Sequence, residues 1–85
     1  MTTPAERCLS ALEFLAPVTD SLVAIRVLDA LDEMERAYPS SEERIDALHW
    51  VHREILHQAW SHSRKPFKRF VAAVIEHRLS ELRSE

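Results

Sequence analysis

The chain of 85 residues contains no glycine, and its four prolines are Pro4, Pro17, Pro39 and Pro66. Tight hairpins and strained loops usually need glycine, so its absence argues against a β-rich fold. Proline lacks an N–H and fixes φ, so it suits the first turn of a helix or the residue just outside one. Each proline begins or follows a segment with helical periodicity. The sequence therefore predicts an all-α domain of four helices.

Four segments have apolar residues at intervals of three and four, as helices with one buried side do. Two of their starts carry capping boxes, in which a hydroxyl residue precedes a glutamate by three positions: Thr3 with Glu6, and Ser40 with Glu43. Short connections make successive helices antiparallel. We expect a single helical domain over residues 1–85, a small bundle in which three longer helices dominate and the short first helix is an accessory. The expected helices cover residues 4–16, 20–38, 41–61 and 66–83.

The size of the chain and its single cysteine limit its stability and its location. A domain of this length buries only about 60–65% of the surface of the unfolded chain, so we expect a homodimer to supplement a modest stability. No apolar run is long enough for a membrane span, and the N-terminus has no signal-peptide pattern. Cys8 has no intramolecular partner and lies on the apolar side of the first helix, where a small buried residue is expected. These features favour the cytoplasm and no association with a membrane.

The net charge of −3 is unevenly distributed along the chain. Residues 1–60 carry five Lys/Arg and eleven Asp/Glu, which gives −6, whereas residues 61–85 carry six Lys/Arg and three Asp/Glu, which gives +3. Such an uneven distribution of charge can support packing within the chain, head-to-tail association of copies, or binding of an anionic partner.

Trp50 is expected on the polar side of the third helix, opposite the apolar stripe. Arg53 and His57, three and seven positions further, share that side. Because exposed large aromatic residues are enriched at recognition surfaces, Trp50, Arg53 and His57 are one candidate binding patch. Alternatively, the first helix or the C-terminal tail covers Trp50 and makes it part of a second core layer. Phe14 falls outside the stripe of the first helix and is a second candidate anchor.

Four cationic residues gather at the start of the last helix: Arg64, Lys65, Lys68 and Arg69. Cations at a helix N-terminus oppose the macrodipole, which suggests an anion held between these side chains and the free amides. Nucleic-acid binding, with Phe67 or Phe70 stacking on bases, is therefore an alternative function. The other interpretation is that the cations complement the acidic second helix or steer a protein partner.

Histidines are concentrated in the third helix and just beyond it, at His49, His52, His57 and His62. The i,i+3 spacing of His49 and His52 permits metal chelation, which makes a metal-responsive regulator a further alternative. Glu54 and His57 form one Glu-x-x-His motif, but no second such motif completes a di-metal site, and the helical angles place His57 away from His52. We therefore expect no resident metal and no cofactor.

Arg78 projects from the middle of the apolar band of the last helix, so it either pairs with an inward acid, marks an interface or extends toward water. Neither a phosphate-binding loop nor a nucleophile elbow is present, and no catalytic triad can be assembled. The sequence favours a small non-enzymatic protein-binding regulator, adaptor or inhibitor, with Trp50 and Phe14 as apolar anchors.

Overall fold

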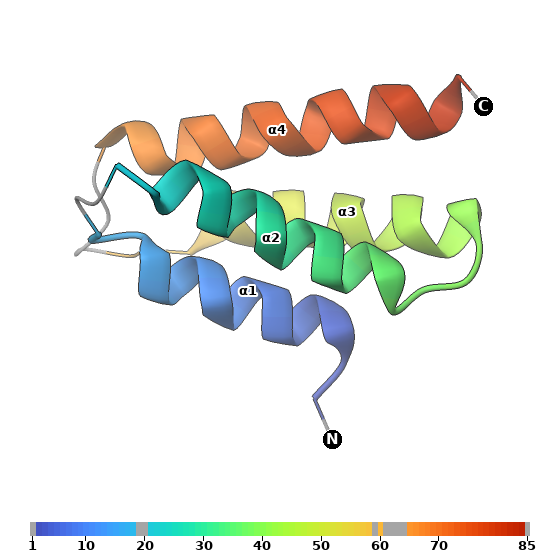
Figure 1. Ribbon diagram of the computed structural model, residues 1–85, viewed down its shortest axis with the longest axis horizontal. Helices are drawn as coiled ribbons and strands as arrows, with labels where there is room; N and C mark the ends of the chain where they lie inside the picture. Colours follow the sequence, from blue (N-terminus) through green and yellow to red (C-terminus); the bar gives the residue numbers. More distant parts are fainter. Residues whose placement is uncertain (1, 19–20, 59, 61–64, 85) are drawn as a thin grey trace.

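Four α-helices account for most of the chain, and no strand occurs among the residues that the structure describes. This computed structural model describes residues 2–18, 21–58, 60 and 65–84. The all-α prediction is therefore confirmed. The helices are α1 (Pro4–Leu15), α2 (Val23–Arg36), α3 (Ser41–His57) and α4 (Lys65–Arg83) (Figure 1).

The starts of α1 and α3 are capped by the hydroxyl residues that the sequence indicates. The amide of Glu6 donates to Thr3 Oγ1 at 3.1 Å, and the amide of Glu43 donates to Ser40 Oγ at 3.2 Å. Both caps have extended backbone and satisfy one of the free amides of the first turn. Pro4 lies at the beginning of α1, where its missing N–H leaves no bond unmade.

Two helices are shorter than their periodicity predicts. α3 ends at His57 rather than near residue 61, because Gln58 turns to an extended backbone with φ −71° and ψ 132°. α2 begins at Val23, after Leu22, which forms no side-chain cap. Thr19 and Asp20, the residues that the sequence offers as caps for this helix, lie outside the described residues. At the C-terminal end of α2, Arg44 Nε donates at 2.9 Å to the carbonyl oxygens of Glu35 and Tyr38.

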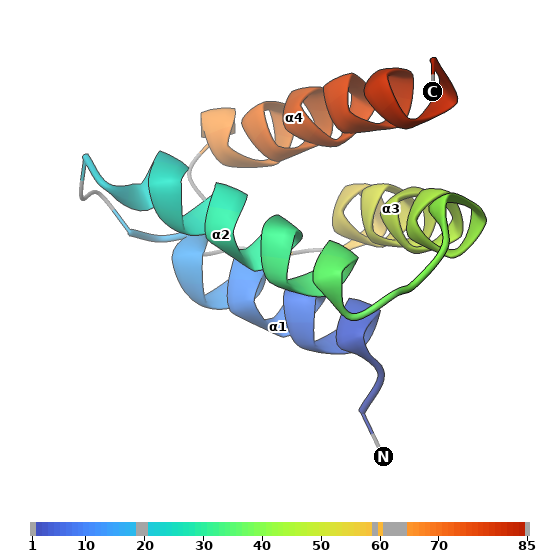
Figure 2. The same ribbon diagram turned by 45° about the vertical axis from the view of Figure 1, so that its right-hand side comes forward.

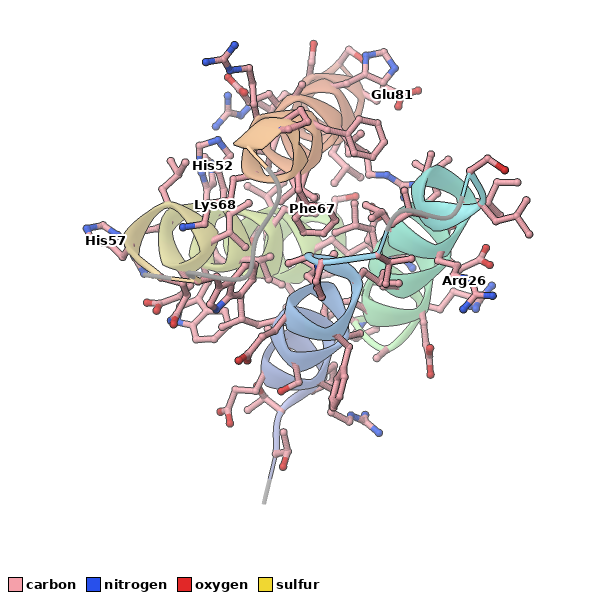
Figure 3. All side chains as sticks on the ribbon, turned by 90° about the vertical axis from the view of Figure 1, so that its left-hand side faces the viewer. Arg26, His52, His57, Phe67, Lys68 and Glu81 are labelled. Carbon is pink, nitrogen blue, oxygen red and sulfur yellow. The ribbon has the colours of Figure 1, made fainter. Side chains whose placement is uncertain are left out.

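Viewed end-on, the helices occupy four corners in the order α4, α2, α1 and α3 (Figure 3). The closely packed pairs are α1 with α2, α1 with α3, and α3 with α4. Consecutive helices run in opposite directions, but α2 and α3 lie at diagonal corners. As a result the neighbours α2 and α4 run in the same direction, as do α1 and α3 (Figures 1 and 2).

The core draws on all four helices, and α1 is not the accessory that its length suggests. Its apolar stripe faces both α2 and α3 from the corner between them, so Ala5, Cys8, Leu12 and Ala16 are all buried. The centre of the core consists of fully buried side chains from every helix: Leu12, Val27, Leu31, Leu48, Val51, Ile55, Val71 and Ile75. Among the described residues, no helix combines the length and hydropathy that crossing a membrane requires.

Candidate functional site

An open groove of about 780 Å³ lies between α2 and α4. These two helices, whose arrangement Figure 2 shows, are neighbours that are not closely packed. A volume of this order is within the range of ligand-binding clefts. The groove is lined by residues of α2, of α4 and of the start of α3: Leu28, Asp32, Glu35, Arg36, Arg44, Phe70, Ala73, Val74, His77, Arg78, Glu81 and Leu82.

Helical spacing explains the α2 wall of the groove. Leu28, Asp32 and Glu35 stand at positions i, i+4 and i+7, so their side chains share the side of α2 that is turned toward α4. Ile25, seven positions before Asp32, continues this side one turn nearer the N-terminus. The α2 wall is therefore apolar in its first half, carries the carboxylates of Asp32 and Glu35 in its second half, and ends at Arg36.

The α4 wall has the same order. Phe70, Val74, His77 and Glu81 follow one another at intervals of four, three and four, and Glu81 lies on the side of α4 toward α2 (Figure 3). Because α2 and α4 run in the same direction, the apolar halves of both walls lie together. The groove consequently has an apolar end and a charged end.

An arginine joins the two walls of the groove. Arg78 Nη1 donates to Asp32 Oδ1 at 2.6 Å and also to Glu35 Oε2. The side chains of Arg78 and Glu35 are 19% and 16% exposed, whereas that of Asp32 is 47% exposed. Burial acts to lower the pKa of Arg78, but the hydrogen bonds to Asp32 and Glu35 outweigh it, so the pKa is raised above its ordinary value. The sequence left three environments open for Arg78: an inward acid, an interface or water. The structure shows that it pairs with the inward acids Asp32 and Glu35.

The Arg78 cluster retains a net negative charge, because two carboxylates share one guanidinium. Glu81 adds a further carboxylate on the α4 wall, with its Oε1 3.4 Å from His77 Nε2. Arg44, at the far end of the groove, is engaged by the carbonyls at the C-terminus of α2, where the helix dipole is negative. Arg36 lines the groove as well, so its three carboxylates are matched in number by three arginines, and the excess of carboxylates is confined to the middle, around Arg78.

Large apolar side chains remain open to solvent at the other end of the groove. Leu28 and Phe70 are each 37% exposed, and Ile25 is 55% exposed. Leu28 and Phe70 line the same groove from two adjacent helices, and Ile25 extends the α2 side by its helical position, unlike the singly scattered apolar residues that are normal on protein surfaces. The groove thus combines an exposed apolar patch with a fixed charged floor.

Trp50, Arg53 and His57, the patch predicted from the third helix, differ in their surroundings. Trp50 is half-buried against the core and borders a shallow hollow formed with the N-terminal part of α1 and with Tyr38. Arg53 and His57 are exposed, and His57 Nδ1 lies 2.7 Å from the carbonyl oxygen of Arg53. The first helix covers part of Trp50, so the aromatic ring and the two polar side chains do not form one open surface.

Phe14, the other predicted anchor, is 82% exposed, the highest value among the large apolar residues described. It lies on the outer side of α1, with Ser10, Glu13 and Pro17 around a shallow hollow. The structure does not bring Phe14 near Trp50, which packs against the other end of α1.

The basic segment can be followed only in part. Arg64 and the side chain of Lys65 lie outside the described residues. Lys68 is turned back toward the end of α3: its Nζ donates to the carbonyl oxygen of Gln58 and lies 5.6 Å from the centre of the Trp60 ring. Arg69 is exposed. Of the two aromatic residues offered for base stacking, Phe67 points into the bundle and is buried (Figure 3), whereas Phe70 borders the groove.

His49 and His52 lie on the outer side of the seam between α3 and α4, where their neighbours weigh against chelation. Arg83 Nη2 is 2.8 Å from His49 Nε2, and since a guanidinium only donates, His49 accepts with the lone pair that a metal would need. His52 Nε2 lies 3.8 Å from Glu76 Oε2. Within the described ranges, no group of three His, Cys, Asp or Glu side chains is placed to hold a metal ion.

Cys8 is buried in the seam between α1 and α2. Burial, and to a smaller extent the nearby charges of Glu33 and Glu35, raise its pKa to about 12. The thiol therefore remains protonated near neutral pH and has little nucleophilic character.

Comparison of the chain with protein-family models, with curated proteins and with solved structures gave no match. The candidate site is therefore defined by its own geometry.

The sequence contained partial signals of the groove. Ile25 stands outside the apolar stripe of the second helix, and Phe70 widens the apolar band of the last helix. Asp32 has no such signal, because its role depends on Arg78, which lies 46 positions further along the chain.

Proposed function

We propose that this protein is a non-enzymatic protein-binding module, an adaptor or inhibitor that takes an amphipathic helix of a partner into the groove between α2 and α4. The observation that carries the proposal is the run of solvent-exposed apolar side chains, Leu28 and Phe70 with Ile25, beside the acidic floor around Arg78. Grooves between helices that combine apolar contacts with a few polar ones are a recurrent way to bind helices.

The groove supports a specific chemistry for the bound helix. Its apolar end accepts aliphatic or aromatic side chains, and its acidic middle accepts a Lys or Arg about two turns away. The C-termini of α2 and α4 lie at the charged end, so a helix that runs antiparallel to both brings its positive N-terminus there. The bound helix therefore has a cationic residue first and apolar residues later. The buried, protonated Cys8 is compatible with work in the cytoplasm.

Two synthetic helical peptides of equal composition test the proposal, one with lysine before leucine residues and one with the reverse order. We expect the first to bind the full chain at least about tenfold more tightly, because only that order satisfies both ends of the groove. The measurement is fluorescence anisotropy with labelled peptide. A groove variant, Leu28→Gln with Phe70→Gln, should lose this binding.

Leu56→Gln serves as a matched control, because Leu56 is an exposed leucine on α3. It should bind the peptides as the unmodified protein does. Equal binding of both peptides, or unchanged binding by the groove variant, would refute the proposed groove function. A physiological partner identified later must, once purified, compete with the labelled peptide.

A further inference from the structure

Phe14 and Arg7 give the outer side of α1 a polarity of its own. They are seven positions apart, which places both on the side of the helix opposite Leu12, and both are exposed. Ser10 and Ala11, which both have small side chains, lie between them, and Arg7 and Ala11 also border the shallow hollow between α1 and α2. The outer side of α1 thus presents a cation near its N-terminus and an aromatic ring near its C-terminus.

This order matches the chemistry of the groove. Seven residues also separate Leu28 from Glu35 on α2 and Phe70 from His77 on α4, and seven helical residues span about 10 Å. A helix antiparallel to α2 and α4 that places Phe14 between Leu28 and Phe70 therefore brings Arg7 level with Glu35 and His77.

At the level of Glu35 and His77, the positive charge of Arg7 would meet the carboxylates of the groove. Asp32 and Glu35 together exceed the charge of Arg78 by one, and Glu81 adds another negative charge on the opposite wall. Arg7 adds a positive charge beside these three carboxylates, while Arg36 and Arg44 line the far end of the groove. The antiparallel direction also brings the positive end of α1 to the negative ends of α2 and α4.

We propose that the groove of one copy takes the outer side of α1 from a second copy, with Phe14 in the apolar end and Arg7 over the acidic middle. This inference rests on the proposed function, since it assigns one bound helix to the groove. It also gives a role to Phe14, whose ring does not contribute to the core of a single chain.

The geometry makes the contact heterologous. The groove opens between α4 and α2, whereas α1 lies at another corner of the bundle (Figure 3). Each copy in a pair therefore keeps one unused groove or one unused α1, and association continues head to tail. A partner helix in the groove competes with this association.

Complementation between two full-length variants tests the inference. The α1 variant is Phe14→Gln, the groove variant is Leu28→Gln with Phe70→Gln, and Leu56→Gln is the control. All the replaced side chains are at least 37% exposed, and circular dichroism verifies that each variant folds. Sedimentation equilibrium over a wide concentration range measures the mass of each protein and of an equimolar mixture of the α1 and groove variants.

The unmodified chain and Leu56→Gln should exceed the monomer mass of 9.9 kDa increasingly with concentration. Each of the other variants should associate at least about tenfold more weakly, since an apolar contact of this size is lost. Their mixture should form one-to-one dimers and nothing larger, because only one productive interface remains.

If the unmodified chain stays monomeric at every concentration, the inference is overturned. The peptide assay then decides independently whether the groove binds helices. Association that survives Phe14→Gln but not the groove substitutions overturns it as well, since groove would then pack on groove. A mixture that stays monomeric, or one that grows beyond dimers, contradicts the head-to-tail contact.

Discussion

The two sides of α2 have very different surroundings. Toward α1 the helix is closed: Val27, Leu31 and Met34 are almost completely buried, and Cys8 of α1 is sealed in the same seam. Toward α4 it is open, and Leu28 retains more than a third of its exposure. The difference follows from the arrangement of helices, because α1 packs closely on α2 whereas polar side chains bridge α2 to α4 across the groove. One helix thus carries both a buried structural side and a side that stays open to solvent.

Two leucines of α2, three positions apart, give the largest test of this contrast. Leu31→Ala should lower the free energy of unfolding by about 2–5 kcal/mol, because it leaves a cavity in a fully buried site. Leu28→Ala should cost less than about 1 kcal/mol, because solvent already reaches Leu28. Urea denaturation of the purified variants measures both values. Equal losses would mean that the groove is closed in solution.

Arg78 is the next most sensitive position, since it bridges the open side. Arg78→Met should lower the free energy of unfolding by roughly 1–3 kcal/mol, because Asp32 and Glu35 lose their shared cation while Glu35 stays largely buried. Arg83→Met, an exposed arginine on the same helix, should change it by less than about 0.5 kcal/mol.

A combined variant separates the loss of the ion pair from the cost of the unpaired acids. Adding Asp32→Asn and Glu35→Gln to Arg78→Met should recover part of the stability, because positions 32 and 35 then no longer hold carboxylates that have lost their shared cation. If the combined variant is less stable than Arg78→Met alone, the carboxylates stabilise α2 by another route.

Cys8 reports on the closed side through the pH dependence of stability. Its pKa is about 12 in the folded chain and about 9 in the unfolded chain, so above pH 9 the unfolded chain releases a proton that the folded chain keeps. The contribution of the protonated Cys8 thiol to the free energy of unfolding is therefore complete below pH 9 and falls as the pH rises. About 1.4 kcal/mol of it is lost by pH 10. Cys8→Ala should show a shallower fall in urea denaturation between pH 8 and 10. Parallel curves would mean that water reaches the thiol in the folded chain.

The closed side is the part of this structure that sequence reasoning predicts well. Leu12, Leu31 and Leu48 recur with helical spacing, and Thr3 and Ser40 cap helices as their capping boxes indicate. These features are local, since each is encoded within a few residues. The predicted ends of α2 and α3 were less accurate, because the periodicity of apolar residues does not indicate where the backbone leaves the helical conformation. In α3 this happens at Gln58.

The open side depends on relations between distant residues, which periodicity does not contain. Nothing local indicates that α2 and α3 take diagonal corners, or that Arg78 meets Asp32 across the groove. The same limit affected Trp50: its position off the apolar stripe left open whether it is an exposed anchor or is covered, and α1 partly covers it. Phe14, by contrast, is as exposed as its position off the stripe implies.

Phe14 should give the smallest effect on the stability of a single chain. In dilute solution Phe14→Ala should change the free energy of unfolding by less than about 0.5 kcal/mol, because the ring is 82% exposed and the backbone of α1 is unaffected. Leu12→Ala, two positions earlier in the same helix, is the matched control and should cost several kcal/mol, roughly 2–5, because its side chain is fully buried. Urea denaturation at low protein concentration measures both. A large loss for Phe14→Ala would place the ring in the core of the isolated chain, and α1 would then have no free side to offer a second copy.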